Sequence, residues 1–576
     1  MTRPYRRMLM VYPAFHKTHW GMRYSLPLIG KQSIMAPLGL ITIAALTPPD
    51  YEIRLIDLNY ESLAESDLEW ADMVCLSGMI AQRRSMFESA RRCKEAGKLV
   101  VFGGPLPTAC PEECESQCDV MVLNEGEITW PPFLEDLARG TYRRVYASEE
   151  KPDVTQAPVP RFELLKVHDY LSIPIQFARG CPYECEFCDI PVMLGRKPRT
   201  KTPPQILAEL DAIYKTGYRG AVMLVDDNFI GKKNDAKKLL PQMQAWNEAH
   251  GNPFYYSTQA TVTLAEDDEL LRLMVGARFA GVFMGVETPL LASLKETHKY
   301  QNTRRSLLES IKVVQSAGIF VYAGFIVGFD NDTEDIFDRQ IEFIRQAAIP
   351  APTLALLFAL PGTPLKKRMS QAGRLRPPER SDDFSGYNTN FDTNIVTVLP
   401  RKKLLEGYRK ILATIYKPTE FFQRSLEFFR RLPRPAAPTS RIQGLVGLGW
   451  LILGIVTGKL GAQQKSKSSK PSQMKLLYDT FRHVPAEYRL ELMKFLWAIL
   501  RTRPDQLQSA LITALIGIHY QRFTFEDLIP DVDHRLDLLA QQGAEPDPNA
   551  PTDTLVQAGP VGLARLRGFA VVTMGK

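Results

Sequence analysis

Short apolar runs alternate with longer stretches of helical pattern through residues 1–150. This alternation is typical of a doubly wound parallel sheet, so we predict a Rossmann-like (flavodoxin-like) α/β domain there. Ligands of such sheets lie beyond the carboxyl ends of the strands, where this chain has small or polar residues. The predicted strands are 8–12, 51–57, 73–78, 99–104 and 120–123. The predicted ligand-facing rim consists of Ser77, Gly78, Gly103, Gly104 and Glu125.

Residues 151–170 are predicted to be a linker, because prolines at 152, 158 and 160 interrupt regular structure. Strands and helices then alternate again over 171–375. Repeated βα units close into a full or partial barrel whose polar strand ends converge at one mouth, and we predict such a partial barrel with Asp226, Asp227 and Glu287 at its mouth. Its predicted strands are 175–178, 221–225, 254–259, 281–288, 321–329 and 352–357, and a helix is predicted over 202–215 with Thr202 as N-cap.

Beyond the barrel the pattern becomes helical, and we predict an α-helical domain over 376–540. The stretch Ile442–Gly458 has no charged residue, but it is short for a membrane span and its glycines weaken a helix. A buried helix over the barrel is the favoured interpretation, and a segment that touches a membrane is the alternative. Residues 541–576 are rich in Pro, Asp and Gly and are predicted to be a disordered tail.

The composition fits a folded protein of about three domains. Of 576 residues, 45% are hydrophobic and 23% are charged. No apolar leader follows Met1, so we expect a cytoplasmic protein, or one associated with a membrane surface, whose cysteines are thiols or metal ligands. The net charge of +7 is modest and forms no compact basic stripe, which argues against a nucleic-acid partner. No G-x-G-x-x-G opens a helix, which argues against a nicotinamide site.

Cys181, Cys185 and Cys188 stand at C-x3-C-x2-C spacing, close enough for one loop to bind a single iron–sulfur cluster. A cubane of four irons needs four outer ligands, so three cysteines leave one iron open for a non-protein ligand. Gly180 fits a loop that must bend sharply, and Phe187 can lie against a flat ligand. The alternative is a zinc knuckle, but zinc needs a fourth Cys or His and none follows within the loop.

A second trio, Cys110, Cys114 and Cys118, has the i, i+4, i+8 spacing of one helix face. Glutamates between these cysteines indicate an exposed helix rather than an iron site. Small buried cysteines on a packing face are the commoner outcome, so we predict a structural role, with a second cluster as the alternative.

The first cysteine loop resembles the signature loop of radical S-adenosylmethionine (SAM) enzymes, C-x3-C-x-aromatic-C. The resemblance implies a [4Fe-4S] cluster whose open iron is chelated by SAM. It also implies one-electron cleavage of SAM to a 5′-deoxyadenosyl radical, which abstracts hydrogen from the substrate.

The same resemblance implies further ligand positions. Asp226 and Asp227 would receive the methionine ammonium, Glu287 lies in a G-x-E-S/T strand motif, and Gly328 would let backbone approach the adenine. The alternatives are a helix cap for Asp227 and a salt bridge for Glu287. One departure from the family pattern is Ala260-Thr261, where many relatives have a basic residue.

Residues 1–150 resemble the cobalamin-binding domain that precedes many radical SAM domains, through Val11-Tyr12-Pro13, Gly103-Gly104-Pro105 and Glu125-Gly126-Glu127. The D-x-H-x-x-G motif, whose histidine ligates cobalt in methionine-synthase-like domains, is absent, because Leu58-Asn59 follows Asp57. Many radical SAM relatives also lack it, so cobalamin is expected without a lower ligand from this domain. The alternative is an inherited domain with an empty groove.

Nearly the whole chain to about residue 525 resembles the branch that includes the hopanoid C-2 methylase and adds a helical C-terminal domain. The resemblance implies cobalamin-dependent methylation of an unactivated carbon on a hydrophobic, lipid-like small molecule. It also implies an electron donor such as a flavodoxin or ferredoxin. The alternatives are a radical enzyme that forms or rearranges carbon–carbon bonds without methylation, and a non-catalytic cobalamin or redox-sensing module.

Overall fold

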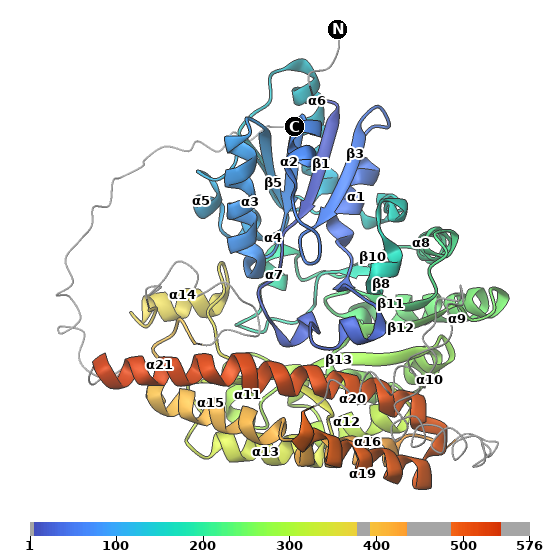
Figure 1. The fold of residues 1–576 in the computed structure, drawn as a ribbon, viewed down its shortest axis with the longest axis vertical. Coiled ribbons are helices and arrows are strands. Elements are labelled where there is room, and N and C mark those ends of the chain that lie inside the picture. The colour runs from blue at the N-terminus through green and yellow to red at the C-terminus, as the bar shows by residue number, and fades with distance from the viewer. Residues whose placement is uncertain (1–4, 377–391, 435–484, 543–576) are drawn as a thin grey trace.

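The computed structural model describes residues 5–376, 392–434 and 485–542. One parallel sheet with its helices lies at one end of the structure, a second sheet lies in the middle, and the C-terminal helices cover the opposite end (Figure 1). This confirms the predicted order of a flavodoxin-like domain, a partial barrel and a helical region. Ile442–Gly458 and residues 543–576 lie outside the described part of the chain.

The first sheet has the order β3-β1-β4-β5-β6-β7 and is parallel throughout. Apolar side chains pack on both of its faces, against α1 and α6 on one side and α2 to α5 on the other. The strands are β1 (Arg7–Tyr12), β3 (Glu52–Asp57), β4 (Met73–Ser77), β5 (Leu99–Gly103), β6 (Val120–Val122) and β7 (Val145–Tyr146). The helices are α1 (Leu38–Leu46), α2 (Glu65–Trp70), α3 (Arg83–Glu95), α4 (Pro105–Ala109), α5 (Pro111–Cys114) and α6 (Gly126–Arg139).

The chain between β1 and α1 leaves this sheet and joins the second one. Its strand β2 (Ser33–Met35) pairs in parallel with β8 at the edge of the second sheet. The turns η1 (His19–Gly21) and η2 (Leu26–Ile29) precede β2, and Ser25 Oγ donates a hydrogen bond of 2.5 Å to the Leu515 carbonyl of a C-terminal helix. The first 150 residues therefore contribute to all three parts of the fold.

The second sheet has the order β15-β14-β13-β12-β11-β8-β2, is parallel throughout and is open at both edges, as expected for a partial barrel. The strand that leads into the cysteine loop is β8 (Tyr170–Ile175), which lies upstream of the predicted 175–178. Pro174 lies inside β8, and because proline is unusual within a central strand, the local sequence pattern does not indicate a strand there. The other strands are β11 (Gly220–Leu224), β12 (Phe254–Gln259), β13 (Phe279–Glu287), β14 (Phe320–Val327) and β15 (Ala351–Leu356).

Most of the helices that follow these strands pack on the outer side of the sheet. The predicted helix at 202–215 is confirmed as α8, with Pro203 at its first position and Thr202 N donating to Gln205 Oε1 at 2.9 Å. The helices are α8 (Pro203–Lys215), α9 (Lys233–Ala249), α10 (Asp268–Gly276), α11 (Leu291–Glu296), α12 (Leu307–Ser316), α13 (Ile336–Gln346) and α14 (Pro364–Gln371).

The C-terminal helices close the remaining side of the barrel. Aromatic side chains of α16 and α19 and aliphatic side chains of α20 form one apolar cluster, and Tyr408 of α15 donates a hydrogen bond of 3.3 Å to the Leu354 carbonyl of β15. No described helix is long and apolar enough to cross a membrane. The helices are α15 (Arg401–Ile415), α16 (Pro418–Arg431), α19 (Ala486–Thr502), α20 (Leu507–Arg522), the π-helical η11 (Phe523–Leu528) and α21 (Ile529–Gln542).

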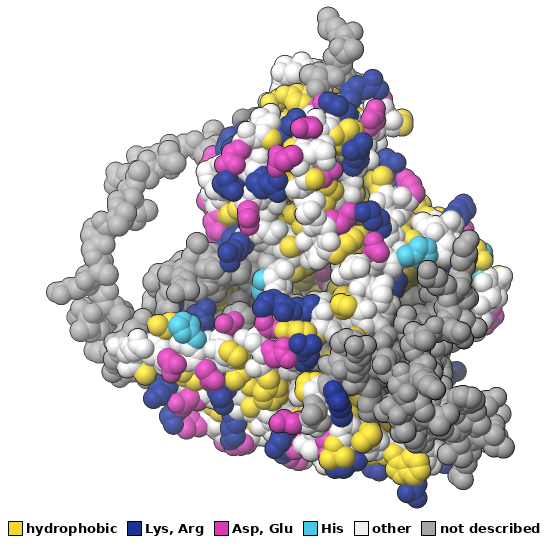
Figure 2. All heavy atoms as spheres, viewed as in Figure 1, with side chains coloured by type: hydrophobic (Ala, Val, Ile, Leu, Met, Phe, Trp, Pro, Cys, Tyr) yellow, Lys and Arg dark blue, Asp and Glu magenta, His cyan; other side chains and the backbone are white. Residues whose placement is uncertain are grey.

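Acidic and basic side chains are interspersed over the face drawn in Figure 2, both on the N-terminal domain and on the C-terminal helices. This face therefore shows no compact basic stripe of the kind that binds nucleic acid.

Candidate active site at the mouth of the partial barrel

The cysteine loop follows β8 and is closed at its base by a short antiparallel pair. β9 (Ala178–Arg179) pairs with β10 (Arg199–Thr200), so residues 180–198 form a closed loop with all three cysteines and the short helix α7 (Ile190–Met193). Gly180 has φ +88°, and a Cβ there would lie 2.7 Å from the Gly195 carbonyl oxygen. The same oxygen accepts a hydrogen bond of 3.2 Å from Cys181 N. The bend predicted at Gly180 is therefore one that only glycine can make.

Asp226 and Asp227 follow β11 and hold the base of this loop. Asp226 Oδ1 accepts a hydrogen bond of 2.7 Å from Phe177 N, and Asp227 Oδ2 accepts one of 2.9 Å from Gly180 N. Burial raises the pKa of Asp226 to about 8 and that of Asp227 to about 6. Asp227 thus bonds to the cysteine loop rather than capping a helix, and contact of either carboxyl group with a methionine ammonium remains a prediction.

Glu287 ends β13 next to a register shift, has φ +66°, and forms a buried ion pair with Lys299. The pair lies across Gly285, where a Cβ would overlap Glu287 Oε1 and lie 2.6 Å from Lys299 Nζ. Burial lowers the pKa of Lys299, but the charges of Glu287, Cys185 and Cys188 raise it more, so the pKa is raised and the ammonium stays charged. The salt-bridge alternative for Glu287 therefore describes its geometry, and Lys299 is charged within that pair.

Lys299 and Gln301 both reach the loop from the turn after α11. Lys299 Nζ lies 5.6 Å from the ring centroid of Phe187, and Gln301 Nε2 lies 3.2 Å from Cys185 Sγ. The Phe187 ring also packs in an apolar cluster with Phe329. Sequence reasoning missed both Lys299 and Gln301, because they lie in an irregular turn with no motif spacing.

Glu186, between two of the cysteines and next to Phe187, ties the loop to the far edge of the sheet. Its carboxylate accepts hydrogen bonds of 2.7 and 2.9 Å from Arg368 of α14, which also bonds to Asp330 at 2.9 Å. Its backbone nitrogen donates to the Thr297 carbonyl, and its carbonyl accepts from Leu365 N. The stretch 360–365, which leads into α14, thus helps to position the cysteine loop.

Gly328 has φ +106° after the end of β14, and its backbone nitrogen donates a hydrogen bond of 2.8 Å to Asp332 Oδ2. A Cβ there would lie 3.4 Å from Leu404 of α15. The glycine is therefore explained by its backbone conformation, and its predicted contact with adenine remains a prediction.

The small rim residues of the first sheet lie side by side. Ser77 and Gly103 are register partners in β4 and β5. Gly104 has φ +87°, and a Cβ there would overlap Ser77 Oγ, so this edge has backbone where other residues would place side chains. Their role in cobalamin binding remains a prediction.

Glu125, the last of the predicted rim residues, joins the two sheets. Its buried carboxylate accepts hydrogen bonds of 2.8 Å from Arg179 and 2.7 Å from Arg199, the residues of β9 and β10 that flank the cysteine loop. Arg179 also bonds to Glu127 at 2.6 Å. These charge-assisted bonds bring the ligand-facing edge of the first sheet to the base of the loop.

Asn59 stands where the cobalt-ligating histidine of a D-x-H motif would be. Its side-chain nitrogen donates a hydrogen bond of 2.6 Å to Asp57 Oδ1, and its oxygen accepts one of 3.0 Å from Phe15 N. Asp57 is also bonded to the hydroxyl of Tyr170 in β8, at 3.0 Å. This position therefore serves packing between the domains.

Cys110, Cys114 and Cys118 are buried in the apolar core of the first domain, and the glutamates between them are exposed. Burial raises the pKa of Cys114 and of Cys118 to about 12. The predicted packing role is confirmed, although α5 ends at Cys114, so the three do not lie along one continuous helix.

The donor set fits a cubane better than a single ion. In the described part of the chain, no three His, Cys, Asp or Glu side chains are grouped to hold one metal ion. In a cubane each cysteine binds a different iron, so the sulfurs need not share one coordination shell. The amide of Gln301, whose Nε2 lies 3.2 Å from Cys185 Sγ, suits an anionic cluster because it can donate a hydrogen bond to a ligand sulfur. The buried Asp226 Oδ2 and Gln301 Oε1 have no hydrogen-bond partner among the described residues and can accept hydrogen bonds from a bound ligand.

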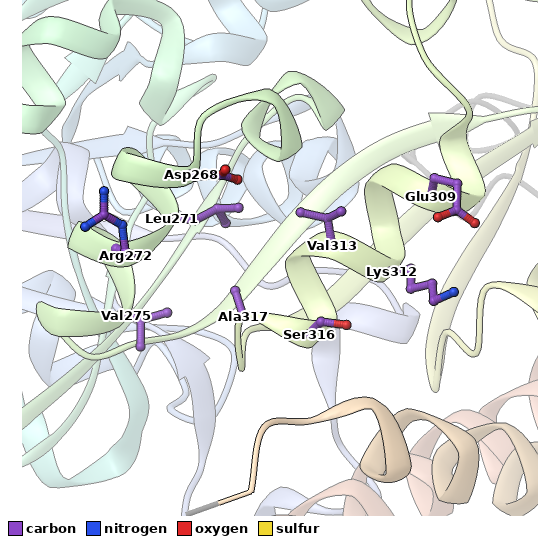
Figure 3. A pocket seen from close by; sticks show the side chains of 9 residues that line it. All are labelled: Asp268, Leu271, Arg272, Val275, Glu309, Lys312, Val313, Ser316 and Ala317. Carbon is purple, nitrogen blue, oxygen red and sulfur yellow. The ribbon is translucent and has the colours of Figure 1, made fainter.

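One pocket lies away from this mouth. It lies between α10 and α12, on the helical outer side of the sheet, and its lining includes Asp268 and Arg272 of α10 and Glu309 and Lys312 of α12 (Figure 3). None of its lining residues belongs to the cysteine loop or to a strand end.

A parallel partial barrel with a three-cysteine loop at its mouth, joined to the ligand edge of a flavodoxin-like sheet, defines a class of radical enzyme with two cofactor sites. The chain matches the models of the B12 binding domain over residues 31–133, the Radical SAM superfamily over 175–344 and a domain of unknown function (DUF4070) over 363–527.

Two curated relatives match most of the chain. It is 42% identical over 465 residues to the uncharacterized methyltransferase sll1242 of Synechocystis sp., and this alignment covers 80% of this chain and 85% of the relative. It is 35% identical over 465 residues to the hopanoid C-2 methylase of Rhodopseudomonas palustris, and this alignment covers 79% of this chain and 86% of the relative. The chain therefore belongs to the cobalamin-dependent radical SAM methylase family, and it is an enzyme.

Solved structures share the fold. The radical SAM methyltransferase TsrM from Kitasatospora setae, solved with cobalamin and a [4Fe-4S] cluster bound, aligns with a TM-score of 0.56 at 16% identity, over 77% of this chain and 96% of that one. The cobalamin-dependent SAM radical enzyme OxsB, solved with aqua-cobalamin and SAM, aligns with a TM-score of 0.55 at 14% identity, over 89% of this chain and 84% of that one.

Proposed function

We propose that this enzyme methylates an unactivated carbon of a flat, apolar small molecule, with a [4Fe-4S] cluster on Cys181, Cys185 and Cys188, SAM and cobalamin. When bound, these groups supply hydrogen abstraction by a 5′-deoxyadenosyl radical and a transferable methyl group. A one-electron donor of the flavodoxin or ferredoxin class reduces the cluster. The methylases among its relatives support this reaction type.

The observation that carries the proposal is the junction of the two sheets at Glu125. Glu125 follows β6 at the ligand edge of the first sheet, and its carboxylate is bonded to the two arginines that flank the cysteine loop. A corrinoid held at that edge would therefore lie next to the barrel mouth, as transfer of a methyl group to a substrate radical requires.

In this proposal the polar residues at the mouth bind and orient. Asp226 and Asp227 accept hydrogen bonds from the methionine ammonium, and Gly328 lets backbone approach the adenine. Ser77, Gly103 and Gly104 leave room for the corrinoid.

The inner wall of the barrel supports a flat, apolar substrate. A Cβ at Gly281 would lie 3.1 Å from the Tyr322 ring, and one at Gly324 would lie 2.9 Å from the Phe283 ring, so each ring lies over a glycine of the neighbouring strand. The ring of Trp20 in η1 lies 5.2 Å from that of Phe283. These three aromatic side chains are partly exposed. Aromatic surfaces of this kind bind apolar ring systems.

Anaerobic reconstitution tests the proposal. We expect corrinoid absorbance in the purified enzyme, 5′-deoxyadenosine formation, and transfer of label from methyl-labelled SAM into the apolar fraction of a lipid extract. Trp20→Leu should lower label transfer while SAM cleavage continues. Bound corrinoid with SAM cleavage, but with no label in any substrate fraction, would contradict methylation and favour a non-methylating radical rearrangement.

A further inference from the structure

We propose that Gln301 is a positioning residue for electron uptake, whose side-chain amide donates a hydrogen bond to the sulfur of Cys185 and raises the reduction potential of the cluster. The inference rests on the proposed function, because it requires the [4Fe-4S] cluster on the cysteine loop. No motif points to Gln301, and its role follows from the tertiary contact alone.

The contact is direct and buried. Gln301 Nε2 lies 3.2 Å from Cys185 Sγ, and Gln301 is 3% exposed. A cysteine that binds iron is a thiolate and can only accept hydrogen bonds, so the amide must turn its nitrogen toward the sulfur. Gln301 Oε1 is buried and has no partner among the described residues, so the contact with Cys185 is the hydrogen bond that orients this side chain.

The 297–302 segment holds Gln301 in place from both sides. The Thr297 carbonyl accepts a hydrogen bond of 2.9 Å from Glu186 N, directly after Cys185. Asn302 Nδ2 donates hydrogen bonds of 3.0 Å to the carbonyls of both Gly285 and Val286 in β13. The turn η9 (Tyr300–Asn302) is therefore fastened to the cysteine loop and to the sheet, and the amide meets the sulfur without rearrangement.

The consequence is electrostatic. One electron from an external donor makes the cluster more negative, and a hydrogen bond to a ligand sulfur stabilises that added charge more in the reduced state than in the oxidised state. No bond forms or breaks at Gln301, and no proton leaves it. Lys299 acts in the same sense, but its charge is compensated by Glu287 within the same buried pair. Gln301 is therefore the described side chain whose hydrogen bond reaches Cys185 Sγ without a counter-charge beside the donor.

The test is a redox titration of the reconstituted full-length enzyme, monitored by electron paramagnetic resonance, with titanium(III) citrate as reductant. In Gln301→Leu we expect the ratio of reduced to oxidised cluster at the wild-type midpoint to fall about fivefold. In Gln301→Glu this ratio should fall further, since a carboxylate of the same shape cannot donate a hydrogen bond and repels the thiolate. Gln315→Leu is the matched control, because Gln315 is equally buried but donates to the Ala347 and Ala348 carbonyls, at 3.0 and 3.2 Å.

A second measurement does not depend on the potential. Pulsed electron paramagnetic resonance of the reduced cluster, compared between H2O and D2O, should show an exchangeable proton coupled to the cluster in the wild type and in Gln315→Leu. This proton coupling should be absent in Gln301→Leu. An unchanged midpoint together with an unchanged proton coupling in Gln301→Leu would overturn the inference. If Gln301→Leu binds no iron, Gln301→Glu decides by the same two readouts. A wild-type protein that assembles no cluster would instead overturn the proposed function.

Discussion

The chain contains two trios of closely spaced cysteines with opposite surroundings. Cys181, Cys185 and Cys188 lie on a loop at the barrel mouth, where the Gln301 amide donates to Cys185 and the buried Lys299–Glu287 ion pair lies near Phe187 of the same loop. Cys110, Cys114 and Cys118 lie in the apolar core of the first domain. Similar spacing thus serves chemistry in one place and packing in the other, and the difference lies in what distant parts of the chain bring to the sulfurs.

The energetic reason is that polar groups are buried only where something requires them. Lys299 and Glu287 are each about one-tenth exposed. The attraction within such a pair offsets the free-energy cost of desolvation only when the two charged groups are in close contact. Among the described residues the core trio has no fully buried ion pair of this kind, because Arg83, whose Nη2 lies 4.0 Å from Cys110 Sγ, pairs with the half-exposed Glu113. The surroundings, more than the spacing, therefore separate a cluster site from a packing site.

The largest effect should come from replacing one cysteine of each trio by alanine, in two separate variants. Cys185→Ala should abolish cluster assembly and 5′-deoxyadenosine formation, because one of the three iron ligands is lost. Cys114→Ala should keep both activities and lower the free energy of unfolding by about 1 kcal/mol. Iron content and SAM cleavage after anaerobic reconstitution measure the difference. Undiminished SAM cleavage in Cys185→Ala would place the site elsewhere.

Removing the charge beside the first trio should cost stability. Lys299→Met leaves Glu287 buried without its partner, and breaking such a pair lowers the free energy of unfolding by about 3–5 kcal/mol. Urea denaturation of the apoprotein measures this loss, and the double variant Lys299→Met/Glu287→Gln should recover part of it. A loss no greater than that of a surface lysine would show that the pair is not buried in solution.

Neutralising Glu125 should loosen the junction between the first domain, which contains the core trio, and the loop that contains Cys181, Cys185 and Cys188. Glu125→Gln leaves Arg199 without a carboxylate partner, and we expect a stability loss of about 1–3 kcal/mol, with faster hydrogen exchange across residues 178–200. Glu163→Gln, which removes an exposed ion pair with Arg161, is the control and should change stability by less than about 1 kcal/mol. Equal exchange in both variants would argue against the junction.

The smallest effect on enzyme activity concerns the core thiols. With a pKa of about 12, Cys114 and Cys118 should react with iodoacetamide about 1000-fold more slowly than a free thiol. Because their pKa is raised in the folded state, stability should fall as the pH rises above the ordinary thiol value of about 8.5. Mass spectrometry should find Cys181 labelled in the apoprotein and protected after reconstitution. Labelling of Cys114 as fast as Cys181 in the apoprotein would contradict the difference between the trios.

Much of the fold could be predicted because strands, caps and turns depend on neighbouring residues. The strand Phe254–Gln259 and the helix that begins after Thr202 agree with the prediction. The three-residue β2 could not be predicted, because a strand of that length has no measurable periodicity, and Pro174 obscured β8.

The candidate site divides in the same way. The cysteine loop, the carboxyl groups after β11 and the small rim residues follow from local pattern and motif spacing. The Lys299 charge, the Gln301 donor and the Glu186–Arg368 bond do not, since each joins residues that are far apart in sequence or lie in irregular turns.

Local order along the chain was thus enough to establish which elements form, which residues bend a loop, and which thiols could bind a cluster. Only the packed structure decided that the first domain threads a strand into the second sheet, that Glu125 serves the junction, and that an amide reaches Cys185. The physical reason is range. Backbone periodicity and turn geometry act over a few residues, whereas hydrogen bonds and ion pairs form wherever folding brings two groups within about 3 Å.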